Sequence, residues 1–282
     1  MSKFLSPLRY PGGKTAIYPF ISKLLDENNL LGGAYAEPYA GGAGLALKLL
    51  KNNLVKEIYL NDFDKAIYAL WYSILHYPDN LIEWISNVNI SVEIWEQYKD
   101  IYKNEKDDLF KLGKATLFLN RTNISGVIKG GVIGGKNQQG KYKIDARFNK
   151  NDLIKKIEGI SSLKDKIHLF NMDGIDFVKK LNKDIFIYFD PPYYKKGSEL
   201  YLNFFRDEDH KALSYFIKTL GNKWMVSYDN EDFIKNLYMD YDQIIYGLYQ
   251  STSNKKGKEI IIFSKELSFI DSISFLDIKT NN

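Results

Sequence analysis

The chain of 282 residues contains no cysteine and only three histidines. Without cysteine it can form neither disulfides nor thiolate metal sites. His76, His168 and His210 are widely separated in the sequence, which argues against a metal cluster. No apolar run approaches the roughly 20 residues of a membrane-spanning helix, and no signal peptide opens the chain. We therefore expect a soluble, cytoplasmic protein with neither a metal nor a membrane partner.

The formal net charge is only +4, but the charge is unevenly distributed. Residues 120–150 carry seven lysines and arginines and one acid, Asp145, so this segment is +6 and the remainder of the chain is −2. The segment is also rich in glycine, asparagine and glutamine. A length of 282 residues allows one large domain, or a core with an inserted module.

Residues 185–194 read Ile-Phe-Ile-Tyr-Phe-Asp-Pro-Pro-Tyr-Tyr, an apolar run of strand character that ends at Asp190. Pro191 and Pro192 fix φ and remove two successive N–H donors, so the local backbone can only accept hydrogen bonds. A carboxylate, the Pro191 carbonyl and the ring of Tyr193 suit a flat heterocycle that carries an amino group, such as adenine.

The exocyclic amine of a purine is a poor nucleophile because its lone pair is delocalised into the ring. Two acceptors, Asp190 and the Pro191 carbonyl, would pull the nitrogen toward tetrahedral geometry, with Tyr193 stacked on the base. The plainer interpretation is a Pro-Pro turn after a core strand, followed by a half-buried tyrosine.

Residues 35–50 predict a short strand, a glycine-rich turn and an apolar helix. Glycines allow a tight turn and a close approach of backbone to a ligand. A second strand then leads to Asp62, which lies 18 residues after Gly44, a distance that suits a carboxylate binding ribose hydroxyls. Leu47 stands where a dinucleotide fingerprint needs its third glycine, which favours a nucleoside site over a pyrophosphate site.

The tripeptide Gly13-Lys14-Thr15 is similar to the end of a phosphate-binding loop. Leu8 stands where such a loop needs its first glycine, and no strand precedes it, which excludes an ATPase or kinase on this motif. We expect Lys14 to hold a carboxylate, the alternative being a simple surface lysine.

With these motifs in place, the chain resembles the Dam-type DNA adenine methyltransferases, which transfer a methyl group from S-adenosyl-L-methionine to the amino group of adenine. The resemblance extends over almost the whole chain. It rests on the segments 7–14, 37–44, 61–63, 171–174 and 190–193. It implies an α/β fold: a Rossmann-like class I methyltransferase core, with a mixed seven-stranded sheet whose last strand is antiparallel, and an inserted helical and loop DNA-recognition domain.

The resemblance also implies roles for individual residues. The catalytic motif is Asp190, Pro191, Pro192 and Tyr193. The expected cofactor contacts are Tyr10, Lys14, Glu37, Tyr39, Gly41, Asp62, Phe63, Asp173 and Asp190. Of these, the acid of the segment 61–63 would bind the ribose, and Asp173 would read the cofactor adenine.

The basic segment 120–150 suits double-stranded DNA, since lysine and arginine neutralise phosphates, while asparagine, glutamine and arginine can read base edges. Its beginning and its end resemble those of the family's DNA-contacting loop. The expected DNA contacts are Asn120, Arg121, Asn123, Lys129, Lys136, Lys141, Arg147 and Asn149. Arg121, at the start of the loop, could read a base edge, clamp a phosphate or serve only the helix end. The plainer interpretation of the segment is a solvated loop.

Helices are expected at 16–27, after Gly44, and at 64–75, 92–103, 107–119, 153–160, 174–181 and 207–220, and strands near 35 and at 57–60, 167–170, 185–189, 224–227, 241–248 and 259–263. The last two strands should form a hairpin. The predicted domains are a core of residues 1–75 and 166–270, a target-recognition insert of residues 76–165, and a peripheral tail, 271–282.

The sequence therefore predicts a site-specific DNA adenine methyltransferase that flips its target base and transfers the methyl group directly, with no metal. A nucleoid-associated enzyme of a bacterium or phage would fit, and the sequence leaves open whether a cognate restriction endonuclease accompanies it. Two alternatives remain: a methyltransferase acting on RNA or on a protein amide, and a DNA-binding protein that keeps the cofactor fold without catalysis.

Overall fold

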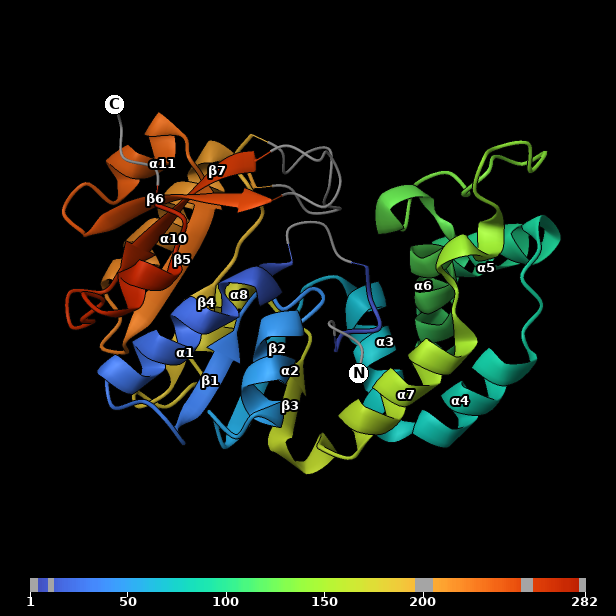
Figure 1. The fold of residues 1–282 in the computed structure, drawn as a ribbon, viewed down its shortest axis with the longest axis horizontal. Coiled ribbons are helices and arrows are strands. Elements are labelled where there is room, and N and C mark those ends of the chain that lie inside the picture. The colour runs from blue at the N-terminus through green and yellow to red at the C-terminus, as the bar shows by residue number, and fades with distance from the viewer. Residues whose placement is uncertain (1–4, 10–12, 196–204, 250–255, 279–282) are drawn as a thin grey trace. The chain divides into compact units, whose positions relative to one another are not determined.

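The computed structural model describes residues 5–9, 13–195, 205–249 and 256–278. Seven strands form one sheet in the order β3-β2-β1-β4-β5-β7-β6 (Figure 1). The strands are β1 (Ala34–Glu37), β2 (Glu57–Asn61), β3 (Ile167–Phe170), β4 (Phe186–Phe189), β5 (Trp224–Asp229), β6 (Gln243–Tyr249) and β7 (Lys256–Phe263). The first five run parallel, and β7 is antiparallel to both β5 and β6. The predicted mixed α/β sheet with its antiparallel final hairpin is confirmed.

Two compact units make up the chain. The sheet unit comprises Gly12–Phe63 and Lys166–Asn282, and the helical unit comprises Met1–Pro11 and Asp64–Asp165. These boundaries differ from the predicted ones, because residues 64–75 were assigned to the core and instead form a helix that packs within the helical unit. The start of the chain also belongs to the helical unit, where Asn120 binds the backbone of Arg9.

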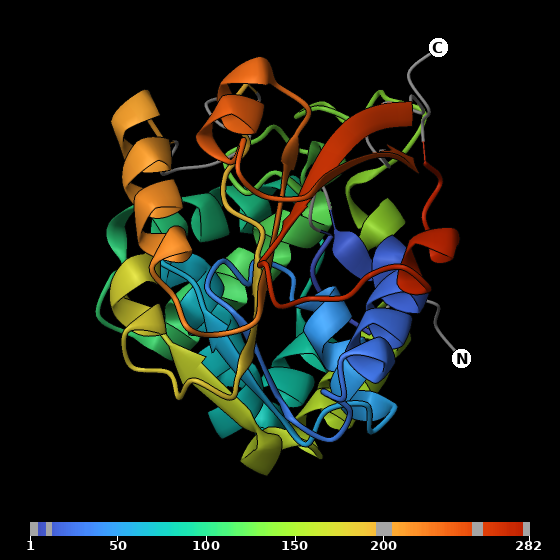
Figure 2. The same ribbon diagram turned by 90° about the vertical axis from the view of Figure 1, so that its left-hand side faces the viewer.

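Both faces of the sheet are covered by helices. The helices of this unit are α1 (Tyr18–Glu27), α2 (Gly44–Lys51), α8 (Gly174–Val178), α10 (Asp207–Lys218) and α11 (Asp232–Leu237), with a 3₁₀ turn, η1 (Lys14–Ile17), before α1. Figure 2 shows α10, in orange, on one side of the sheet and α1 and α2, in blue, on the other. Alternate residues along the buried strands face the two layers. Ile187 and Val226 pack with Leu213 and Ile217 of α10, whereas Phe263 meets Phe20 of α1.

The helical unit is built around α6. Its helices are α3 (Lys65–His76), α4 (Pro78–Asn87), α5 (Val92–Asn104), α6 (Leu109–Thr122) and α7 (Lys150–Ser161). Helices α3, α5, α6 and α7 each begin at a side chain that accepts a backbone N–H, namely Asp64, Ser91, Asp108 and Asn149. Helix α6 packs against both α3 and α5. It continues to Thr122, three residues beyond the predicted end, so Asn120 and Arg121 are helical residues and not loop residues.

Two helices, α4 and α11, were not predicted. Residues 271–278, predicted as part of a peripheral tail, are hydrogen-bonded to the sheet unit. Backbone N–H groups of Asp271 and Ser272 donate to the carboxylate of Glu27 on α1, and Gly247 of β6 donates to the Asp277 carbonyl. The segment therefore packs on the sheet unit as an integral part of it.

In the part of the chain that the structure describes, no helix is long and apolar enough to cross a membrane. The same residues contain no cluster of three or more histidine, aspartate or glutamate side chains that could hold a metal ion.

The close contact of α6 with α3 depends on Gly113. A Cβ added there would lie 2.3 Å from Ser73 Oγ and 2.6 Å from the Ala69 carbonyl oxygen. We therefore predict that Gly113→Ala lowers the free energy of unfolding by about 1–3 kcal/mol, the usual cost of overpacking. Thermal and urea unfolding would measure it.

The matched control is Gly159→Ala in α7, where an added Cβ has no neighbour within 4 Å among the described residues. Alanine is the better helix former by about 1 kcal/mol, so this variant should be neutral or more stable. Equal effects of the two substitutions would contradict the packing argument.

Candidate active site

Acidic side chains lie at the carboxyl ends of neighbouring parallel strands. Glu37 is the last residue of β1, Asp62 follows β2, Asp190 follows β4, and Asp229 is the last residue of β5. In open α/β sheets, the crevice outside these strand ends is where ligands bind. The sheet order places β2, β1, β4 and β5 side by side, so these four acids share one edge.

Lys14, in η1, is the centre of the site and is only 6% exposed. Its Nζ lies 2.8 Å from Asp190 Oδ1 and donates to Tyr193 OH over 2.8 Å. The Glu259 carboxylate is 3.7 Å away. The expectation that Lys14 holds a carboxylate is confirmed, and a surface position is excluded.

Glu259, on β7, completes this arrangement and was not predicted from the sequence. It is 1% exposed and accepts hydrogen bonds from the hydroxyls of Tyr193 and Tyr246, the latter over 2.7 Å. Lys14, Asp190, Tyr193 and Glu259 therefore form one connected polar network inside the sheet unit. Glu259 was missed because it directly follows Lys256-Gly257-Lys258, which looks like the polar end of a hairpin.

The Asp190 carboxylate is held from the sheet side as well. Ser227 Oγ donates to Asp190 Oδ1 over 2.7 Å, and the hydroxyl of Tyr188 lies 2.7 Å from Ser227 Oγ. Two residues after Ser227 on β5, Asp229 accepts the backbone N–H groups of residues 194 and 195, each over 2.9 Å. Asp229 follows an apolar run just as Asp190 does, so the same sequence signal could have identified it.

Burial and neighbouring charge act in opposite directions on this network. Burial alone would lower the pKa of Lys14, but the carboxylates of Asp190 and Glu259 outweigh it and hold that pKa well above its usual value. Burial raises the pKa of Asp190, whereas the charge of Lys14 lowers it. The pKa of Asp190 is raised overall, and Lys14, followed by the hydrogen bond from Ser227, opposes that shift.

Glu37 is buried close to this network and has a different environment. Burial raises the pKa of its carboxyl to about 8, although a hydrogen bond from Tyr35 over 2.9 Å opposes the shift. The charge of Asp190 raises it further. At neutral pH, Glu37 is therefore largely protonated.

The turn after β1 and the end of β2 are tied together. Gly41, at φ 46°, donates its N–H to Asp62 Oδ2 over 2.9 Å. Asn61, fully buried, donates to the carbonyls of Pro38 and Met172 and so links the ends of β1, β2 and β3. The predicted cofactor residues of these three strands therefore lie along one continuous edge.

Three further residues expected at the cofactor lie at this edge. Phe63 is 58% exposed, which is unusual for so large an apolar side chain. Asp173 caps α8 by accepting the N–H groups of residues 175 and 176. Tyr39 packs so tightly on Gly174 that a Cβ there would lie 2.7 Å from its hydroxyl. Tyr10, also expected at the cofactor, lies outside the described residues.

The structure does not give Tyr193 the exposed ring that base stacking requires. Its side chain is turned into the network, the residue is 6% exposed, and Lys14 Nζ lies 5.0 Å from the ring centroid. In this conformation Tyr193 supports Lys14 and Glu259. Stacking on a base would require the ring to leave this position.

Three of the residues expected to contact DNA are buried at the end of α6. Asn120, Arg121 and Asn123 are 1%, 8% and 0% exposed. The Asn123 side chain accepts from Trp95 and donates to the carbonyls of residues 127 and 128. Burial and the nearby charge of Arg9 lower the pKa of Arg121 to about 10. These side chains were expected to contact DNA, but in the structure they hold the backbone of the helical unit together.

The other expected DNA contacts are on the surface of the helical unit. Lys129, Lys141 and Arg147 are exposed. Lys136 pairs with Glu96 over 2.8 Å, but both side chains are more than half exposed, so this ion pair is weak. The exposed Asn149 uses its side-chain oxygen to cap α7.

Comparison with known proteins identifies the family to which the chain belongs. A model of the D12 class N6 adenine-specific DNA methyltransferases matches residues 10–253. The chain belongs to this family. The matched range includes Lys14, the strand-end acids of β1, β2, β4 and β5, and the basic segment 120–150.

Curated relatives have the same character. The chain is 27% identical over 260 residues to the type II methyltransferase M.MjaIII of Methanocaldococcus jannaschii, covering 83% of this chain and 88% of that protein. It is 27% identical over 230 residues to the type II methyltransferase M.CviBI of Paramecium bursaria Chlorella virus NC1A, covering 80% and 85%. The type II methyltransferase M1.LlaDCHI of Lactococcus lactis subsp. cremoris is 25% identical over 252 residues, covering 83% and 84%.

Solved structures are more distant. The structure of M. capricolum TrmK in complex with S-adenosyl-homocysteine covers 87% of this chain and 69% of its own, at 13% identity and a TM-score of 0.36. The rRNA methyltransferase aviRa of Streptomyces viridochromogenes covers 92% and 86%, at 9% identity and a TM-score of 0.35.

Family membership settles the activity. The protein is a site-specific adenine DNA methyltransferase, its cofactor is S-adenosyl-L-methionine, and its substrate is DNA. The predicted family, adenine methyltransferase activity and cofactor are confirmed, whereas flipping of the target base stays a prediction. The two alternatives, a methyltransferase for RNA or protein and a DNA-binding protein without catalysis, are set aside.

The Lys14 network predicts a change in the pH dependence of methylation. In Lys14→Met the charge that lowers the pKa of Asp190 is lost, so that pKa rises. If the carboxylate form of Asp190 is the active one, the acid limb of the kcat/KM profile should move to higher pH. The measurement is kcat/KM for methyl transfer to duplex DNA between about pH 5 and pH 9.

The exposed Lys51, also in the sheet unit, offers the control Lys51→Met, which should keep the wild-type profile. A Lys14→Met enzyme whose activity is reduced equally at every pH would show that Lys14 does not act on the ionisation of Asp190. Recovery at high pH would also show that the variant is folded.

Proposed function

We propose that the protein captures its target adenine outside the duplex, with Asp190 and the Pro191 carbonyl each accepting one hydrogen of the amino group. The observation that carries this proposal is the state of Asp190. Its carboxylate is held by Lys14 and Ser227, yet its side chain remains 25% exposed at the strand edge. Extruding a base costs a few kcal/mol, which its contacts in the site must offset.

When bound, the cofactor supplies an electrophilic methyl group on a sulfonium. The protein must then position the amino nitrogen and make its lone pair available, and the two acceptors of the Asp190-Pro191 segment suit that task. The reaction is direct, with a new N–C bond formed as the S–C bond breaks and the amino proton released. A chain without cysteine is consistent with a transfer that needs no thiolate intermediate.

The strand edge also fits the cofactor. Asp62, fixed against the turn by the Gly41 N–H, suits ribose hydroxyls, and the exposed ring of Phe63 offers an apolar surface for a purine. The full set of proposed cofactor contacts is Tyr10, Lys14, Glu37, Tyr39, Gly41, Asp62, Phe63, Asp173 and Asp190. In this set, Glu37 acts as a neutral acid and Lys14 acts mainly through Asp190.

The helical unit is proposed to bind the duplex. Its exposed cations Lys129, Lys136, Lys141 and Arg147 suit phosphates, whereas Asn120, Arg121 and Asn123 would act indirectly by holding the backbone. The names of the curated relatives, type II methyltransferases, favour a restriction endonuclease as a functional partner. Acting on genomic DNA would place the enzyme at the nucleoid in the cytoplasm.

We predict that expressing the protein in a host without this modification produces N6-methyladenine at one short sequence. We also predict that Asp190→Ala reduces turnover by about 10²-fold or more, which is the scale of losing one oriented transition-state partner. Sequencing of host DNA would find the site, and single-turnover assays would measure the loss. Asp184→Ala, which removes an exposed acid of the same unit, is the control. Near wild-type turnover of Asp190→Ala would refute the mechanism.

For Asp62→Ala we expect a different result, namely cofactor affinity weakened by about tenfold or more with little change in the rate of the bound complex. A hydrogen bond to a charged group contributes about 1.5–3 kcal/mol, and 1.4 kcal/mol corresponds to tenfold in affinity. Calorimetry with S-adenosyl-L-methionine would measure it. An unchanged dissociation constant would remove Asp62 from the cofactor site.

A further inference from the structure

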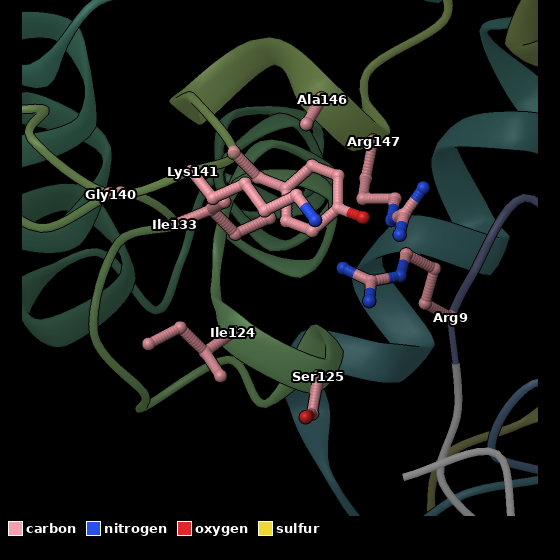
Figure 3. A pocket seen from close by; sticks show the side chains of 10 residues that line it. Arg9, Ile124, Ser125, Ile133, Gly140, Lys141, Ala146 and Arg147 are labelled. Carbon is pink, nitrogen blue, oxygen red and sulfur yellow. The ribbon is translucent and has the colours of Figure 1, made fainter.

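A basic hollow of about 310 Å³ lies in the helical unit, between the start of the chain and the basic segment (Figure 3). The side chains of Arg9 and Arg147 enter it together, although they are far apart in the sequence. Lys141 and Tyr142 form another part of its wall, with Ile124 and Ser125 below. Arg9 is not among the residues that the sequence predicted to contact DNA.

The described residues that line the hollow carry positive charge and include no acid. Across the described ranges of the chain, no carboxylate comes within 4.0 Å of the charged groups of Arg9, Lys141 or Arg147. Burial and the charge of Arg147 lower the pKa of Arg9, which is the expected result of two cations held close together. The hollow is therefore suited to bind an anion.

Arg9 is held in place by buried amides. Asn120 accepts the Arg9 N–H over 2.8 Å and donates to the Arg9 carbonyl over 3.0 Å. Arg9 Nη1 donates to the Asn123 carbonyl over 3.2 Å. Gly126 fits against the Arg9 carbonyl, since an added Cβ would lie 2.4 Å from its oxygen. A guanidinium fixed in this way loses little conformational entropy when it binds.

The opposite wall is organised by Tyr142, which is 54% exposed. The guanidinium carbon of Arg147 lies 5.5 Å from its ring centroid and Lys141 Nζ lies 5.8 Å from it, so the ring orients both cations.

We propose that this hollow is a binding site for one phosphodiester group of the DNA substrate, clamped between Arg9 and Arg147. The proposal rests on the proposed role of the helical unit in binding DNA. A guanine edge is neutral and is read by one bidentate guanidinium, whereas two converging guanidiniums suit a full negative charge. The buried Asn120 acts through Arg9 as a positioning residue.

The salt dependence of DNA binding tests the proposal. Because each phosphate contact contributes about 0.9 to the slope of log K against log salt concentration, Arg9→Ala and Arg147→Ala should each flatten the slope by up to about one unit. The double variant should lose no more than about one unit in total, because both side chains serve the same phosphate. Lys155→Ala, which removes an exposed charge from α7, is the control and should leave the slope near wild type.

The contact can be located with a duplex that carries the target sequence and has single phosphates replaced by neutral methylphosphonates. One replacement should weaken wild-type binding and have no further effect on the double variant. Unchanged salt slopes for both arginine variants would overturn the proposal. So would a loss of discrimination at one base pair in Arg147→Ala without a change in slope, since that result marks a base-reading arginine.

The outcomes separate this proposal from the proposed function. Wild-type protein is first assayed for adenine methylation and for binding to the unmodified duplex. If the wild type methylates DNA and both arginine variants keep its salt slope, only the phosphate site fails. Thermal unfolding of each variant, and an Arg9→Lys variant that keeps the charge and should retain most of the slope, exclude a loss of fold as the cause.

Discussion

A lysine ammonium taken out of water needs negative partners, and the sheet unit is organised around that requirement. Lys14 meets Asp190 at the end of β4 and Glu259 on β7, two strands that flank β5. Removing one partner from a buried ion pair typically costs about 3–5 kcal/mol, because the remaining charge stays buried. The final hairpin is therefore part of the Lys14 network: without β7, Lys14 would lose its second carboxylate.

The sequence predicted the parts of this site that follow a local rule. Asp62 and Asp190 each come directly after an apolar strand, and parallel strands bring such ends to one edge. It could not predict Glu259, whose burial depends on Lys14 and on two tyrosine hydroxyls remote in sequence. For the same reason it gave Tyr193 a base-stacking role, since nothing local indicates that its hydroxyl has buried partners.

In the helical unit, the sequence predicted an exposed basic surface, but several residues assigned to that surface are buried. An asparagine amide suits a base edge and a buried backbone equally well, so residue type alone does not distinguish the two uses. The deciding fact is that α6 continues to Thr122, which puts Asn120 inside the unit. Arg9 shows the converse: it stands inside the segment 7–14, whose Tyr10 and Lys14 were assigned to the cofactor, yet it lines the basic hollow.

The Lys14 network and the basic hollow use separate sets of charges. Every member of the Lys14 network belongs to the sheet unit, and every residue lining the basic hollow belongs to the helical unit. Charges exposed to solvent are screened by salt within about 8–10 Å, whereas a buried network is screened far less. Salt should therefore weaken DNA binding through the hollow and leave the ionisation of Asp190 nearly unchanged. A change of pH near the pKa of Asp190 should alter that ionisation and leave DNA binding through the hollow nearly unchanged.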